Sequence, residues 1–261
     1  MRRLAMARIK DITDYIDVIA PPETAESWDN PGLQTGKRDQ KVTSVVLSLD
    51  VTSSAIQKCV ETGSNLLITH HPLIFGGIDT VSEEDTNGLL LSLLIRNGIT
   101  YYAAHTNLDK ANEYSNFVLA SKLGAVPESI RTIDGVDYGA YYELPETVTL
   151  REYMQSIREA LNSTGTISIN NPDNTLRKAF VQGGSFEEDY IPAVLESGAD
   201  LVVSGEIKHH VTQLLAHKGI LSIIAGHNAT ERVFVENLKD VLEKQFPEVS
   251  FYYDEGYENM L

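Results

Sequence analysis

Residues 55–74, AIQKCVETGSNLLITHHPLI, contain the repeating element of an α/β fold. The first part has the apolar spacing of a helix, Gly63 can end that helix, and residues 65–70 form a run typical of a buried strand. The run leads directly into His70, His71 and Pro72. Proline cannot donate a ladder hydrogen bond, so the strand is expected to end here, where two successive imidazoles can turn into one cavity.

The same alternation of strand and helix extends along most of the chain. Apolar runs predict strands at residues 44–50, 65–70, 99–105, 178–184, 200–205 and 221–227. Helical periodicity predicts helices at residues 52–62, 86–97, 112–123, 149–162, 187–197, 208–218 and 229–245. Such alternation predicts an α/β protein with mixed, largely parallel sheets.

The two halves of the sequence resemble each other. Within residues 55–71, the helix, glycine turn and strand align without a gap on IPAVLESGADLVVSGE, residues 191–206, when Glu61 is placed on Glu196. Further along, YYAAHTNLD matches SIIAGHNATE, and each has an acid four residues after a histidine. These pairs are His105 with Asp109 and His227 with Glu231, and they favour an internal duplication.

Composition excludes several classes of function. The net charge is −16, with 37 acidic and 21 basic residues and no basic cluster beyond Arg2 and Arg3, which argues against nucleic-acid binding. The single cysteine, Cys59, is expected in the core and fits a reducing cytoplasm. The N-terminus lacks the apolar core of a signal peptide, and no run of about 18 apolar residues predicts a membrane span.

Most of the histidines and several acids follow predicted strands, where the loops of an α/β sheet converge and ligands bind. Imidazole and carboxylate ligands without thiolate suit Zn, Fe, Mn, Co or Ni, and a bridging carboxylate could hold two such ions. Any one of these histidines could instead bind no metal and only donate a hydrogen bond to a backbone carbonyl. The residues concerned are His70, His71, His105, Asp109, Glu206, His209, His210, His227 and Glu231.

Two other stretches favour structural roles. ESWDNPGLQTG, residues 26–36, has a dense turn signal and the only tryptophan, which predicts a turn packed by Trp28 in preference to a catalytic loop. QGGSF, residues 182–186, has too few glycines for a dinucleotide site. The C-terminal segment FYYDEGYENML predicts a strand followed by a disordered end.

Five motifs in order, WDNPGLQTG, LLITHHPLIF, AAHTNLD, VVSGEIKHH and AGHNATE, resemble the dinuclear-metal family called GTP cyclohydrolase 1 type 2, or NIF-three-like. The resemblance implies two interlinked, similar α/β domains, residues 1–125 with 226–261 and residues 126–225, in a toroidal homohexamer. It also implies two divalent metal ions per subunit. Carried over to this chain, the family's ligands are His70, His71, Asp109, His227 and Glu231.

The resemblance further implies a metal-dependent hydrolase, with a nucleotide as possible substrate. Water activated by two metals could open a purine ring, with Glu231 as a bridging, catalytic ligand and His105 as a proton carrier beside the metals. Glu206, His209 and His210 are expected to support ligands or face substrate. Two alternatives stay open: a two-metal phosphoesterase, whose usual signatures are missing, and a non-enzymatic metal-binding or regulatory scaffold.

Overall fold

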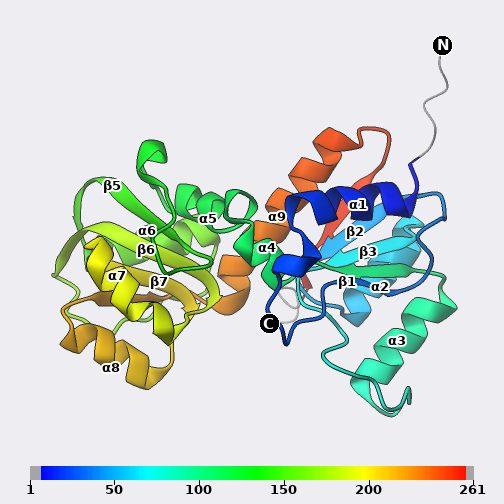
Figure 1. The fold of residues 1–261 in the computed structure, drawn as a ribbon, viewed down its shortest axis with the longest axis horizontal. Helices are drawn as coiled ribbons and strands as arrows, with labels where there is room; N and C mark the ends of the chain where they lie inside the picture. Colours follow the sequence, from blue (N-terminus) through cyan, green and yellow to red (C-terminus); the bar gives the residue numbers. More distant parts are fainter. Residues whose placement is uncertain (1–6, 257–261) are drawn as a thin grey trace. The chain divides into compact units, whose positions relative to one another are not determined.

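The computed structural model describes residues 7–256 and divides into two compact α/β units (Figure 1). The first unit contains the chain up to Leu108 and again from Val235, and the second is Asp109–Phe234. The chain changes unit within two helices, α4 (Thr106–Lys110) and α9 (His227–Gln245). The sequence placed these crossings near residues 125 and 226. The predicted fold class, α/β with largely parallel strands, is confirmed.

The first unit contains a five-stranded sheet in the order β1-β4-β3-β2-β9. Only the edge strand β1 runs antiparallel to its neighbour. The predicted strands at 44–50, 65–70 and 99–105 are confirmed as the three central ones. The strands are β1 (Gly32–Thr35), β2 (Val45–Ser48), β3 (Leu66–Thr69), β4 (Thr100–Ala103) and β9 (Phe251–Asp254).

One row of side chains across this sheet shows how the sequence builds the core. Val46, Leu67 and Tyr101 lie in register on β2, β3 and β4 and are buried beneath α2 (Ser53–Thr62) and α3 (Thr86–Arg96). Successive strand residues face opposite sides, so each of these apolar runs supplies both faces of the sheet. The α2 helix starts at Thr52, whose hydroxyl accepts a hydrogen bond from the Ala55 amide, and ends at Gly63 with φ +65°.

The second unit repeats this arrangement with a four-stranded sheet in the order β5-β6-β7-β8. The last three strands are parallel and β5 is antiparallel to β6. Side chains from β5, β6 and β7 pack with α7 and α8 in one core cluster, and Figure 1 shows these two helices together beside the sheet. The elements are β5 (Ala140–Thr149), α6 (Leu150–Leu161), β6 (Thr175–Ser185), α7 (Ile191–Ser197), β7 (Leu201–Glu206), α8 (His209–His217) and β8 (Leu221–Ile224).

The internal similarity in the sequence has a structural counterpart. In both units a parallel strand, a helix and a second parallel strand follow one another, and Gly63 and Gly198 end the equivalent helices α2 and α7 in the left-handed region, at φ +65° and +73°. In each unit, a histidine also follows the third parallel strand and lies next to the start of a helix. His105 lies between β4 and α4, and His227 follows β8 as the first residue of α9.

The structure adds elements that the sequence analysis missed. A helix, α1 (Ile9–Ile19), buries Ile9, Ile12 and Ile16 along one face, and β1 lies within the segment expected to be only a turn. The helix predicted at 112–123 is shorter, because a 3₁₀ turn at Asn112–Tyr114 precedes α5 (Asn116–Lys122). The predicted C-terminal strand is β9, while residues 257–261 lie outside the described part of the chain.

Among residues 7–256, no helix combines the length and the apolar character needed to cross a bilayer.

Candidate functional site

Three histidines of the first unit form a group with the geometry of a metal-binding cluster. His70, His71 and His105 each offer a ligand atom within 4.8 Å of the others. Their ring centroids are 5.1 to 5.5 Å apart. His70 and His71 follow β3, and His105 follows the neighbouring β4, so the group lies where two adjacent parallel strands end. The sequence placed His105 outside the ligand set, whereas the geometry groups it with the other two.

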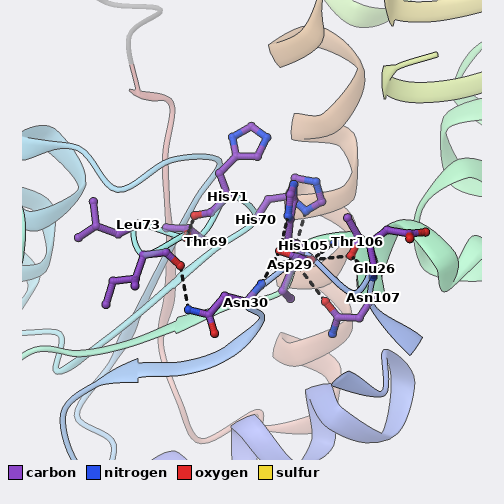
Figure 2. Close-up of polar contacts among 12 residues, drawn as sticks. Glu26, Asp29, Asn30, Thr69, His70, His71, Leu73, His105, Thr106 and Asn107 are labelled. Carbon is purple, nitrogen blue, oxygen red and sulfur yellow. Dashed lines mark hydrogen bonds and ion pairs between the residues drawn. The ribbon is translucent and has the colours of Figure 1, made fainter. Parts of the chain in front are cut away.

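The Nδ1 atom of each of these rings is held by an oxygen acceptor. His70 Nδ1 donates to the Ala104 carbonyl (2.8 Å), and His71 Nδ1 lies 2.7 Å from Asp50 Oδ1. His105 Nδ1 lies 2.8 Å from Asp29 Oδ1, a pairing drawn in Figure 2. A neutral imidazole that donates through Nδ1 presents its lone pair on Nε2, and metal-ligating histidines are usually oriented in this way.

Asp29 holds His105 through a carboxylate whose two oxygens both accept hydrogen bonds. Oδ1 accepts from the Asn30 amide as well as from His105, and Oδ2 accepts from the Thr106 amide (3.0 Å) and hydroxyl (2.5 Å) (Figure 2). Burial raises the pKa of Asp29, but the hydrogen bonds from His105 and Thr106 outweigh it and lower this pKa from 3.8 to about 2. The side chain is therefore an ionised, fully buried acceptor at neutral pH.

The two acids that orient these rings, Asp29 and Asp50, are not among the residues predicted from the sequence. The predicted turn is present at residues 27–28, but the predicted packing by Trp28 is wrong, because Trp28 is 58% exposed while its neighbour Asp29 holds His105. Asp50 follows β2, the strand beside β3. It lies at a strand end like the histidines, so the same rule could have identified it.

The turn after β3 explains how two adjacent histidines face the same region. The His71 carbonyl accepts hydrogen bonds from the hydroxyls of Thr69 (2.7 Å) and Tyr101 (3.0 Å), and the Tyr101 hydroxyl also accepts from the Leu73 amide (2.9 Å). Figure 2 shows Thr69, His71 and Leu73 in this turn. Strand geometry ends at Thr69, so the opposite-face rule no longer separates His70 from His71, as the sequence predicted.

In the second unit, the first turn of α9 brings together a histidine and a glutamate. His227 Nε2 lies 2.8 Å from Glu231 Oε2, and His227 Nδ1 lies 3.2 Å from Glu206 Oε1. A neutral imidazole donates through only one nitrogen, so a neutral His227 ring can donate to only one of these two carboxylates, and a bound cation could be shared by the ring and both acids. Glu206 thus contacts His227, one of the predicted ligands.

Two glycines leave room for the side chains of His227 and Glu231. A Cβ atom on Gly184, which has φ +67°, would lie 2.1 Å from Glu231 Oε1. One on Gly205 would lie 2.7 Å from the His227 Cα atom and 2.7 Å from the Thr230 hydroxyl. The glycines of QGGSF and VVSGE therefore allow the start of α9 to approach the ends of β6 and β7.

A second carboxylate lies beside Glu231. Asp109 and Glu231 each offer a ligand atom within 4.8 Å of the other, and both residues are buried, 7% and 4% exposed. The Asp109 backbone is fixed because its carbonyl accepts hydrogen bonds from Ser115 (2.9 Å) and Asn116 (3.3 Å). Two ionised carboxylates at this separation repel each other unless a proton or a cation lies nearby.

The remaining histidines of the second unit lie elsewhere. His210 pairs with Glu188 at 3.1 Å on an exposed part of α8. His209 lines a cavity of about 150 Å³ together with Ile169 and Thr212. His217, which the sequence analysis set aside, is exposed at the end of the same helix.

Comparison with known proteins identifies the family. The family model described as Duf34/NIF3 (NGG1p interacting factor 3) matches residues 7–255. The chain belongs to the Duf34/NIF3 family. This confirms the family resemblance seen in the five sequence motifs, and the matched region contains both groups of candidate ligands.

Two relatives and one solved structure match this chain over most of their length. A Streptomyces coelicolor protein named GTP cyclohydrolase 1 type 2 homolog is 32% identical over 237 residues, which cover 87% of this chain and 82% of that protein. A Clostridium perfringens protein of the same name is 29% identical and covers 94% of this chain and 95% of its own. The crystal structure of Staphylococcus aureus hypothetical protein SA1388 superposes with a TM-score of 0.87 at 27% identity, covering 95% of this chain and 96% of that one.

The donor atoms fit a divalent transition metal. The first unit offers imidazoles with Nδ1 engaged, and the second offers two buried carboxylates and another imidazole. Nitrogen and oxygen donors of this kind suit Zn, Fe, Mn, Co or Ni. The Duf34/NIF3 protein therefore contains histidine, aspartate and glutamate groups that could bind a metal ion.

Proposed function

We propose that this protein is a hydrolase that uses two divalent metal ions, and that its reaction is a GTP cyclohydrolase type of purine ring opening. The proposed ligands are His70, His71, Asp109, His227 and Glu231. Membership of the Duf34/NIF3 family and two relatives named GTP cyclohydrolase 1 type 2 homolog support the reaction class.

One observation carries the metal assignment: the buried carboxylates of Asp109 and Glu231 offer ligand atoms within 4.8 Å of each other. Two neighbouring negative charges out of water are costly, and divalent cations offset this cost. Glu231 also contacts His227, so it is the residue best placed to serve two ions.

The side chains around the proposed ligands have distinct tasks. When bound, two divalent metals supply Lewis acidity and a water of lowered pKa. Asp50 and Asp29 hold His71 and His105 through Nδ1, so that each ring keeps one orientation. His105 can accept or release a proton at Nε2, because its Nδ1–H group donates to the Asp29 carboxylate. Glu206 similarly orients His227.

The decisive experiment combines metal analysis with product identification. Protein purified without chelator is analysed for metals per chain, then loaded with each candidate metal and incubated with GTP. We expect two metals per chain and release of formate. Release of phosphate alone would replace the proposal by a two-metal phosphoesterase. Two tightly held metals without turnover of GTP would favour a metal-binding scaffold.

Substitution of the bridging ligand tests the residue assignment. Glu231→Gln should lose at least one metal and most of the activity, because a neutral amide is a much weaker ligand than a carboxylate. Glu243→Gln is the matched control, since Glu243 lies on the same helix but is half-exposed and pairs with Lys239. A Glu231→Gln protein with two metals and full turnover would contradict the assignment.

The homohexameric ring and the cytoplasmic location stay predictions from the sequence. Mass photometry of the full chain would measure the assembly, and a hexamer is the expected result.

A further inference from the structure

A half-exposed aromatic pair lies beside the histidines of the first unit and has no role in metal binding. Trp28 is 58% exposed and Phe75 is 50% exposed, and their rings are stacked at 6.5 Å with 23° between their planes. Both rings meet His105 edge-on, at centroid distances of 5.9 and 5.7 Å. Adjoining large aromatic side chains that stay half in water are a feature enriched at binding surfaces.

The backbone on either side of this pair is fixed, although the rings are exposed. Asp29, next to Trp28, is held by His105 and Thr106. Asn30 donates from its side chain to the Ile74 carbonyl (2.8 Å), so the segment before Phe75 is tied to the segment after Trp28 (Figure 2). The Ile74 amide donates to Gln34 Oε1 (3.0 Å). The backbone that carries the two rings is therefore preorganised, which lowers the entropy lost on binding.

The chemistry around Phe75 restricts what could bind there. A cavity of about 230 Å³ adjoins its ring and is lined by Asp79, Thr80, Asp85 and Asn87. The Asp85 carboxylate already caps α3 through the Gly88 amide. Of the remaining polar groups, Asp79 is a negatively charged acceptor, which repels phosphate and accepts hydrogen bonds from N–H groups, and Thr80 and Asn87 can each accept as well as donate.

We propose that Trp28 and Phe75 form a stacking platform for a planar nitrogen heteroaromatic ring with N–H donors, and that this platform places the ring of the substrate beside His105. The inference deepens the proposed function, since it specifies how the substrate of that site is recognised. Aromatic side chains bind such rings face to face, largely independently of the rest of the ligand. Trp28 and Phe75 are positioning residues in this scheme.

The sole tryptophan makes the platform directly observable. Trp28 is the only tryptophan in the chain, so its emission reports on this surface in the unmodified protein. Guanosine, which has the ring, is titrated in parallel with ribose 5-phosphate, which lacks it. We expect guanosine to quench the emission and ribose 5-phosphate to leave it unchanged, in both metal-loaded and chelator-treated protein.

Substitutions assign the binding to the ring pair. Phe75→Leu should weaken guanosine binding roughly tenfold, and Phe75→Tyr should restore it, because a tyrosine ring stacks equally well. Tyr252→Leu, which removes a partly exposed aromatic ring from β9 of the same unit, should have no effect. Equilibrium dialysis measures the same affinities without relying on Trp28, and thermal unfolding verifies that each variant is folded.

The outcomes separate this inference from the proposed function. Unchanged guanosine affinity in folded Phe75→Leu, or equal binding of ribose 5-phosphate, would overturn the platform even if the protein held two metals and released formate. Trp28 emission that changes with protein concentration but not with guanosine would also overturn the platform. It would assign Trp28 and Phe75 to a contact between two chains. Conversely, Phe75-dependent guanosine binding by a protein that holds no metal would support the platform while contradicting the metal-dependent reaction.

Discussion

Asp50 Oδ1 lies 2.7 Å from Nδ1 of His71, across two parallel strands whose ends are adjacent. The contact gives the Nδ1 proton of His71 an anionic acceptor and leaves the Nε2 lone pair for a metal. Asp29 holds His105 in the same manner. The orientation of these rings is therefore set by acids outside the proposed ligand set.

Replacing Asp50 by asparagine should weaken metal binding more than it weakens the fold. An asparagine carbonyl can still accept the His71 proton, but the loss of negative charge makes the imidazole a poorer donor to the metal. We expect metal affinity to fall roughly tenfold or more, as measured by competition with a chromophoric chelator. The stability change should be small, because Asp50 is partly exposed.

Asp39→Asn provides the control for Asp50→Asn. Asp39 is a strongly exposed acid of the same unit, with only distant ion pairs at 3.9 Å. The Asp39→Asn protein should bind metal with the same affinity as the unsubstituted protein. Equal metal affinity in Asp50→Asn and Asp39→Asn would show that Asp50 has no part in tuning the ligand.

Replacing Asp29 by asparagine should instead destabilise the first unit. Both oxygens of this buried carboxylate accept hydrogen bonds, so an amide group in either orientation places N–H groups against donors. We expect the free energy of unfolding to fall by about 2 kcal/mol, measured by urea denaturation of metal-free protein. A loss no larger than that of Asp39→Asn would contradict this account of the turn.

A pair of glycine substitutions separates backbone strain from displacement of a proposed ligand. Gly184 and Gly198 have similar dihedral angles, φ +67° and +73°, so alanine should cost about 1 kcal/mol of backbone strain at each. Only at Gly184 would the new Cβ meet Glu231, at 2.1 Å, since nothing lies within 4 Å at Gly198. Gly184→Ala should therefore lose metal, whereas Gly198→Ala should retain it at the same measured stability.

Elemental analysis measures the metal content of the two glycine variants. Full metal content in Gly184→Ala would mean that Glu231 can move aside without loss, and would argue against it as a bridging ligand. Metal loss in both variants would trace the effect to general destabilisation of the second unit.

The strands and the histidines at their ends could be predicted because both follow from local patterns. Runs such as SVVLSLD and NLLITH are short, apolar and bounded by turn signals, and β2 and β3 formed where they predicted. Parallel strands place their carboxyl ends together. That rule alone brings His70, His71 and His105 near one another, and the structure confirms this grouping.

The acids that orient the rings could not be predicted by the same means. Asp29 lies in a segment dominated by turn residues, and its partner His105 is 76 positions away. Asp–Asn–Pro–Gly is a strong local signal for a turn, which concealed the tertiary contact. The packing predicted for Trp28 is wrong for a related reason. Tryptophan side chains are on average largely buried, whereas Trp28 is exposed, and a sequence pattern does not show such an exception.

The single cysteine gives a test of the fold that does not depend on metal. Cys59 is fully buried in α2, and burial, with a smaller effect of the Asp254 carboxylate, raises its pKa from 9.0 to about 12. The folded state then holds the thiol proton more tightly than the unfolded state does. Its contribution to stability is complete below pH 9 and is lost as the pH rises toward 12.

Two measurements check this expectation for Cys59. In native protein near neutral pH, a thiol reagent should react only as fast as the first unit opens, and denaturant should release the full reactivity. Above pH 9, the unsubstituted protein should lose up to about 1.4 kcal/mol of stability per pH unit more than Cys59→Ala, because the variant lacks the titrating group. Tyrosine ionisation affects both proteins alike, so the difference isolates the thiol. Rapid labelling of the folded protein, or parallel alkaline stability curves, would contradict the buried position of Cys59 in the core.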